Sequence, residues 1–174
     1  MKRILSVVMS FAVVMLIGAS GTWAQDKAKD AKAAPAAKGS GTDVFSGDWK
    51  LNLAKSKYDP GPPPKGPNVN KIEAIEGGLK FTNDGVNAEG KPTHSEWSGK
   101  FDGKDNPVKG DPGRDTAALK KIDDYTTEII SKKAGKVTTT NRTVYSRDGK
   151  TRTQTVQGTN AQGIKINNTV VSEK

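Results

Sequence analysis

Apolar and polar residues alternate in short runs from residue 43 to the end of the 174-residue chain. In the first run, Trp49, Leu51 and Leu53 alternate with polar neighbours. In a later run, Trp97 and Phe101 share one face, and polar side chains lie on the other. A period of two is typical of strands with one buried face, and no segment keeps the spacing of an amphipathic helix. The pattern therefore predicts β-strands.

Turn-forming residues separate these runs at intervals of about ten residues. Gly77-Gly78, Ala134-Gly135 and Asp148-Gly149 each fall between two strand-like runs. Such dipeptides favour the tight turns of β-hairpins. We therefore predict one all-β domain over residues 43–174, an antiparallel meander of about 8–10 strands that closes as a barrel or packs as a sandwich.

Two segments lack the alternation. Five prolines lie between residues 60 and 67, which excludes a helix or a central strand, so we expect an extended surface segment. Asp102, Asp105, Asp111 and Asp115 lie among glycine and proline, and for this acidic segment we predict turns. Carboxylates also suit Ca²⁺, but the spacing is not that of a calcium-binding loop, and we predict no metal site.

The N-terminal residues follow a different pattern. Lys2 and Arg3 precede an apolar run over residues 4–17, and small residues lead up to Ala24. This order is typical of a secretory signal peptide, and the run is shorter than the roughly 20 residues that span a bilayer. We expect cleavage after Ala24 and a periplasmic or secreted protein without stable membrane insertion; an uncleaved anchor is the alternative. Residues 25–42, rich in alanine, lysine and glycine, predict a disordered linker.

Composition narrows the chemistry. The chain has no cysteine, which excludes zinc fingers, iron–sulfur clusters and thiol catalysis. An exported domain without disulfides depends on core packing and backbone pairing for its stability. The whole chain carries a net charge of +9, but from residue 43 onward 22 basic residues are interspersed with 17 acidic ones. We therefore expect a solvated surface and no nucleic-acid partner.

Residues 45–51, Phe-Ser-Gly-Asp-Trp-Lys-Leu, resemble the first strand of the calycins, the lipocalins and cellular fatty-acid-binding proteins. With residues 52–58 they are also similar to a group of small exported bacterial proteins of unknown function. The calycin resemblance implies a lipocalin-like β-barrel in which Trp49 plugs one end. Two features depart from it: the proline run stands where fatty-acid-binding proteins insert two lid helices, and residues 164–174 lack their carboxylate-binding Arg-x-Tyr. The resemblance therefore implies no ligand residues here.

The last three predicted strands are rich in threonine and asparagine on both faces, as at a sheet edge or around a wet interior. In a wet interior, Arg142 and Arg152 would bind a carboxylate or phosphate group, with Tyr145 beside them and Trp97 against the ligand. The alternatives are outward-facing arginines and a purely structural Trp97. His94, the only histidine, is expected at the surface, and the chain contains no catalytic motif.

These patterns predict a non-enzymatic, extracytoplasmic protein that binds a small lipophilic or amphiphilic molecule and needs no cofactor. The alternative is a structural or protein-interaction domain with a filled interior. The space inside the barrel discriminates between the two. An interior fully packed by large residues would exclude the binding hypothesis, and the residues that could fill it are Trp49, Leu51, Phe81, Trp97, Phe101 and Ile129.

Overall fold

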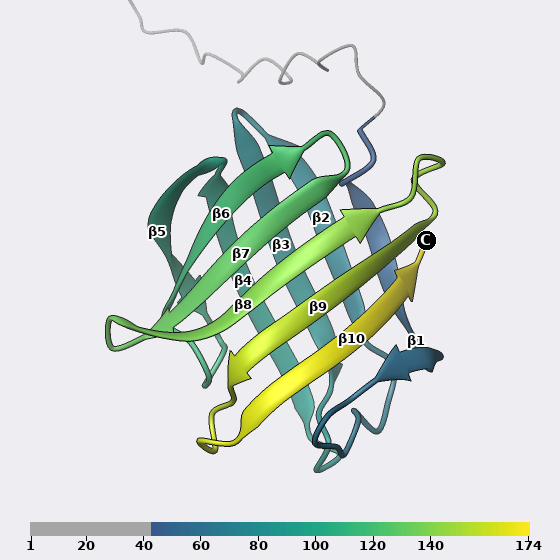
Figure 1. Ribbon diagram of the computed structural model, residues 1–174, viewed down its shortest axis with the longest axis vertical. Helices are drawn as coiled ribbons and strands as arrows, with labels where there is room; N and C mark the ends of the chain where they lie inside the picture. The colour runs from purple at the N-terminus through teal and green to yellow at the C-terminus, as the bar shows by residue number, and fades with distance from the viewer. Residues whose placement is uncertain (1–42) are drawn as a thin grey trace, which may run out of the picture. The chain divides into compact units, whose positions relative to one another are not determined.

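The computed structural model describes residues 43–174; the expected signal peptide and linker lie outside the described residues. The described part contains ten strands and no helix. These are β1 (Gly47–Lys57), β2 (Val69–Ile75), β3 (Gly78–Val86), β4 (Pro92–Lys100), β5 (Asp102–Lys109), β6 (Thr116–Asp123), β7 (Thr126–Lys133), β8 (Lys136–Tyr145), β9 (Thr151–Thr159) and β10 (Lys165–Glu173). Each strand pairs antiparallel with the next, and β10 pairs with β1, which closes the sheet into a barrel (Figure 1). The predicted all-β meander is confirmed.

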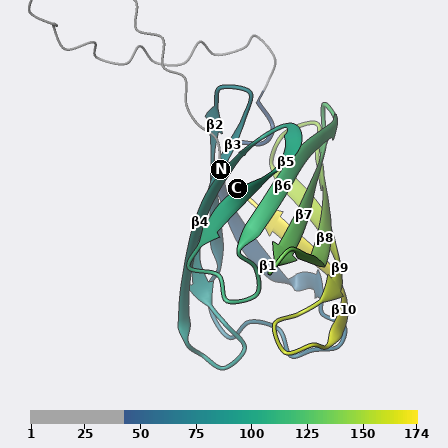
Figure 2. The ribbon, with the colours of Figure 1, turned by 90° about the vertical axis from the view of Figure 1, so that its left-hand side faces the viewer.

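The strands form two facing walls. Figure 2 shows β2, β3 and β4 on one side of the barrel and β7 to β10 on the other. The β7–β8 connection illustrates how the sequence makes the hairpins. Ala134 and Gly135 both have positive φ, 48° and 75°, as a two-residue type I′ turn requires, and this turn matches the twist of the strands that it joins.

The acidic segment forms the predicted turns only in part: a turn follows Asp111, whereas the first half of the segment is a strand. Residues Asp102 to Lys109 form β5, which pairs with β6 through partners such as Asp105 and Ala118. The turn propensity of aspartate and glycine is weak compared with backbone pairing to a neighbouring strand. The irregularity that these residues introduce is a shift of register between Asp102 and Asp105.

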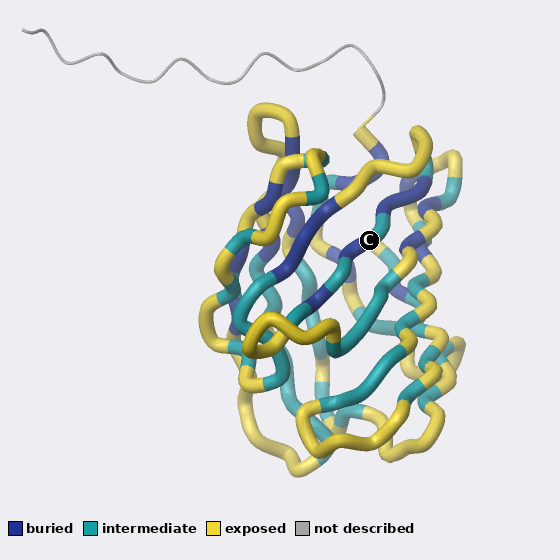
Figure 3. The backbone as a smooth tube through the Cα atoms, turned by 60° about the vertical axis from the view of Figure 1, so that its left-hand side comes forward, coloured by how far each residue is buried: buried dark blue, intermediate teal, exposed yellow. Residues whose placement is uncertain are grey.

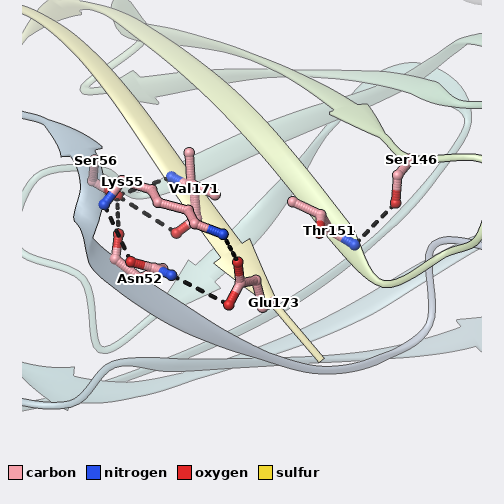
Figure 4. A network of polar contacts seen from close by, with 7 residues as sticks. All are labelled: Asn52, Lys55, Ser56, Ser146, Thr151, Val171 and Glu173. Atoms are coloured by element: carbon pink, nitrogen blue, oxygen red, sulfur yellow. Dashed lines mark hydrogen bonds and ion pairs between the residues drawn. The ribbon is translucent and has the colours of Figure 1, made fainter.

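The β1–β10 pairing that closes the barrel contains a wide bulge. Asn52 lies opposite Val171, but Lys57 lies opposite Thr169, so β1 holds three extra residues. Side chains bridge the interruption. The Val171 backbone amide donates to the Ser56 hydroxyl (2.9 Å), and the Asn52 side-chain amide donates to the Glu173 carboxylate (Figure 4). Because β1 leaves the ladder here, Leu53 is 42% exposed rather than half-buried as its alternation predicts.

The interior is packed at one end only, which we call the closed end. There Trp49 is 1% exposed, and its indole Nε1 donates to the Phe45 carbonyl at 2.8 Å. The Phe45 and Tyr145 rings meet edge to face with centroids 4.9 Å apart. Figure 3 shows the buried residues concentrated toward this end, whereas the opposite end is mostly exposed or partly buried.

Candidate functional site

The opposite end of the barrel, which we call the open end, is bordered by five connections. These connections are residues 58–68, 87–91, 110–115, 134–135 and 160–164. A pocket of about 330 Å³ lies inside this border. It is lined by Asp111, Pro112, Gly113, Arg114, Ser131, Thr138, Thr139, Asn141, Val156, Thr159, Asn160, Ala161 and Ile166. The β5–β6 connection and the β9–β10 connection therefore meet over the interior.

Two charged side chains line this pocket, Arg114 and Asp111. The Arg114 side chain is 19% exposed, and its Nε donates to Asp111 Oδ2 at 2.9 Å. Its Nη1 donates to the Ser131 hydroxyl at 3.3 Å, and its guanidinium carbon lies 5.8 Å from the ring centroid of Trp97. Asp111 is itself fixed, because its other oxygen accepts the Gly113 amide at 2.8 Å. The β5–β6 connection thus holds a guanidinium in a defined orientation at the pocket.

Trp97 lies below Arg114 inside the barrel. It is 5% exposed and stacks on Phe81 of the neighbouring strand, with ring planes 4° apart and centroids at 4.5 Å. Gly99, two positions further on the same face, leaves room for this ring, because a Cβ there would lie 2.9 Å from Trp97. The indole therefore forms an apolar surface between the arginine and the packed half of the interior.

Hydrogen-bonded side chains line the two walls above the packed half. On β2, β3 and β4, the Asn70 amide donates to Asn83 (2.6 Å), and the Asn83 amide donates to Ser95 (3.2 Å). On the facing wall, the Gln154 amide donates to the Thr143 hydroxyl (3.3 Å). Partly buried Val156 and Ile166 interrupt the polar surface of that wall. The lumen therefore offers both hydrogen-bonding groups and aliphatic contact.

The structure brings three of the predicted residues together, but away from this pocket. Tyr145 and Arg152, both 3% exposed, lie with Trp49 at the closed end. The Arg152 guanidinium and the Lys174 ammonium lie 5.1 Å and 4.6 Å from the Trp49 ring centroid. Burial lowers the pKa of Arg152. Burial likewise lowers the pKa of Lys174; the charge of Asp43 opposes this shift, and that of Arg152 adds to it.

Arg142 lies elsewhere. It is exposed, between Asn141, which lines the pocket, and Thr143, which is buried. Successive strand residues point to opposite faces, so Arg142 is on the outside of the barrel and does not line the lumen. Tyr145, three positions along the same strand, necessarily faces the other way. Of the four predicted ligand residues, Trp97 alone lies against the pocket's arginine.

Arg114 is not among the residues that the sequence pattern singles out. It stands in an Asp-Pro-Gly-Arg segment, a composition that predicts only a surface turn. The turn is present, since Asp111 accepts the Gly113 amide, but the barrel's curvature directs it over the lumen. The available sequence signal is the Asp111–Arg114 spacing, which allows a local ion pair that orients the guanidinium.

A second, shallower groove of about 500 Å³ lies beside the pocket, where β9 ends and β10 begins. It shares Thr159 and Ile166 with the pocket, and its other lining residues are Asp59, Pro60, Gln157, Gly158, Lys165 and Asn167. The Asp59 carbonyl accepts the Asn167 amide at 2.7 Å, which fixes the start of the proline segment against β10. The proline segment therefore forms part of the border of the open end.

No model of a known protein family matches the chain, and no curated protein is found to be similar to it. Within residues 43–174 there is no helix of the length and hydropathy needed to cross a membrane.

Proposed function

We propose that this domain is a non-enzymatic binding protein for a small amphiphilic molecule, and that it works outside the cytoplasm. The half-filled interior is the observation that carries the proposal. Aromatic packing closes one end, whereas the other end contains a pocket of about 330 Å³. Ligand pockets in proteins typically measure roughly 300–1,000 Å³. A domain with a purely structural interior would be expected to pack both ends.

The lining favours an amphiphile over a purely lipophilic ligand. Asn141 and Ser131 present hydrogen-bonding groups, and Val156 and Ile166 present aliphatic surface at the same pocket. A polar group buried without a partner is costly, so an entirely apolar ligand would leave the amide and hydroxyl groups unsatisfied. The expected signal peptide and the calycin-like first strand support the extracytoplasmic and barrel-binding parts of the proposal.

Native mass spectrometry of the protein purified from its own host tests this function. We expect a second species at the mass of the protein plus one small molecule, which dissociates at higher collision energy. The substitution Val156→Phe fills the pocket from β9 and should remove the bound species. Thr155→Phe adds the same ring on the exposed outer face and should retain it. Loss of the bound species from neither variant, or its absence from the wild type, would contradict the proposal.

A further inference from the structure

Charge is divided unequally between the two ends of the barrel. The five open-end connections together with the strand ends beside them (57–68, 87–91, 109–115, 132–137 and 159–165) contain nine basic and four acidic residues, and six of the nine basic residues lie on the strand ends. The closed-end segments 43–48, 75–78, 99–103, 121–125, 145–151 and 173–174 contain five basic and eight acidic residues. The open end is therefore net positive and the closed end net negative. A binding-site opening with net charge of one sign raises the local concentration of ligands of the opposite charge.

Arg114 has donors available for such a ligand. A guanidinium carries five N–H donors in a planar fork. Within the described residues its hydrogen bonds go to Asp111 and Ser131, and these use two of the five. Asp111 accepts from Nε, which leaves the edge formed by the two Nη groups without a carboxylate. On that edge, Nη1 donates one N–H to Ser131. That edge matches the two oxygens of a carboxylate or phosphate group, which arginine binds in a bidentate manner.

The surroundings of Arg114 strengthen an ion contact made there. The side chain is largely withdrawn from water, since it is 19% exposed and lies against the Trp97 ring. Charged pairs are screened less at such a position than at the surface. In the same pocket, Val156 and Ile166 provide aliphatic surface. The pocket therefore combines the Arg114–Asp111 ion pair with polar and aliphatic side chains.

The geometry points to an oxyanion on the ligand: we propose that the open end binds an amphiphile with a carboxylate or phosphate head, which Arg114 binds at the mouth. This inference rests on the proposed function and adds the charge of the ligand to it. Asp111 is a positioning residue that holds the guanidinium across the pocket. The surrounding lysines of the open end increase the rate at which the anion arrives.

Isothermal titration calorimetry with matched probes tests the inference. Decanoate, decyl phosphate and decanol share one tail and differ in the head group. We expect at least one of the charged probes to bind ~10-fold or more tightly than decanol, the size expected of hydrogen bonds to a charged group. The better of the two charged probes identifies the head group. Equal affinity for charged and neutral probes would overturn the anion inference but leave the proposed function standing.

Variants assign the effect to Arg114. Arg114→Gln should reduce the preference for the charged probe to less than ~3-fold, and Arg114→Lys should restore part of it. Arg142→Gln removes the same charge from the exposed outer face of β8 and should change nothing. An unchanged preference in Arg114→Gln would overturn the assignment.

The wild-type protein provides a measurement independent of any variant. Raising the salt concentration should weaken binding of the charged probe and leave decanol unaffected, because screening acts on the head group alone. Salt-insensitive binding of the charged probe would also overturn the inference. Failure of all three probes to bind would overturn it as well, whereas native mass spectrometry decides the proposed function separately.

Discussion

Truncation of the same residue type at the two ends of the barrel should cost very different amounts of stability. Ile72 on β2 is 1% exposed at the packed part of the interior, whereas Ile166 on β10 is partly buried and lines the pocket. Both point inward from antiparallel strands. Replacing either by alanine deletes the same atoms and causes the same loss of strand propensity. The difference between the two variants therefore reports packing alone.

The magnitudes follow from burial. Ile72→Ala loses the transfer free energy of three buried carbons, ~2.4 kcal/mol at ~0.8 kcal/mol each. The cavity left in a packed region adds ~1 kcal/mol or more, which gives ~3–4 kcal/mol in all. Ile166→Ala loses only part of the transfer term, and water fills the enlarged pocket, so we expect ~1 kcal/mol. The free energy of unfolding should thus differ by ~2 kcal/mol or more between the variants.

Urea denaturation followed by circular dichroism measures both values under identical conditions. The slope of each transition must match that of the wild type for the comparison to hold, because an altered slope signals a changed unfolded or native state. Equal costs at the two positions would refute the division into a packed and an open end. That result would also remove the observation on which the proposed function depends.

Two further outcomes concern the wall of the barrel. His94 Nδ1 donates to Asp84 Oδ1 at 2.7 Å, and this hydrogen bond raises the pKa of the imidazole. The pair should stabilise the fold below the unfolded pKa of about 6.5 and lose that effect as the pH rises through the folded pKa. NMR titration of the single histidine should show the elevated pKa, and Asp84→Asn should return it toward 6.5; an identical pKa in both proteins would contradict the pairing. Gly158 has φ of 142°, and a Cβ there would clash with the Thr138 carbonyl, so Gly158→Ala should lower the free energy of unfolding by ~2 kcal/mol or more. Gln157→Ala is its exposed control, and similar urea midpoints for the two variants would argue against the close approach.

The sequence predicts the fold better than the site, for physical reasons that particular residues illustrate. Alternation around Trp97 and the Ala134-Gly135 turn are local signals, and they are sufficient to predict strands and hairpins. Asp102 to Lys109 resisted prediction because pairing with β6 is a non-local interaction. Leu53 breaks its own alternation because of the bulge, which depends on β10.

The site could not be predicted from the sequence because it depends on how the sheet curves and where its connections lie over the interior. Arg142 and Arg152 differ in the face of the sheet that each occupies. Once β8 and β9 are aligned, the alternation of strand residues places Arg142 outside the barrel and Arg152 inside it. Arg114 lies over the lumen because the β5–β6 connection folds across it, and no property of residues 111–114 alone specifies that direction.

The closure of the barrel between β1 and β10 has a consequence for how the chain folds. Nine of the ten strand pairings join neighbours in the chain, whereas the Val171 amide and the Ser56 hydroxyl that meet across the closure are 115 residues apart. Local hairpins form at little cost in chain entropy, but bringing together the two ends of the meander requires closing the longest loop in the domain. We therefore expect the hairpins to assemble early and the β1–β10 contact to form last, so that substitutions at Ser56 accelerate unfolding and leave the folding rate nearly unchanged.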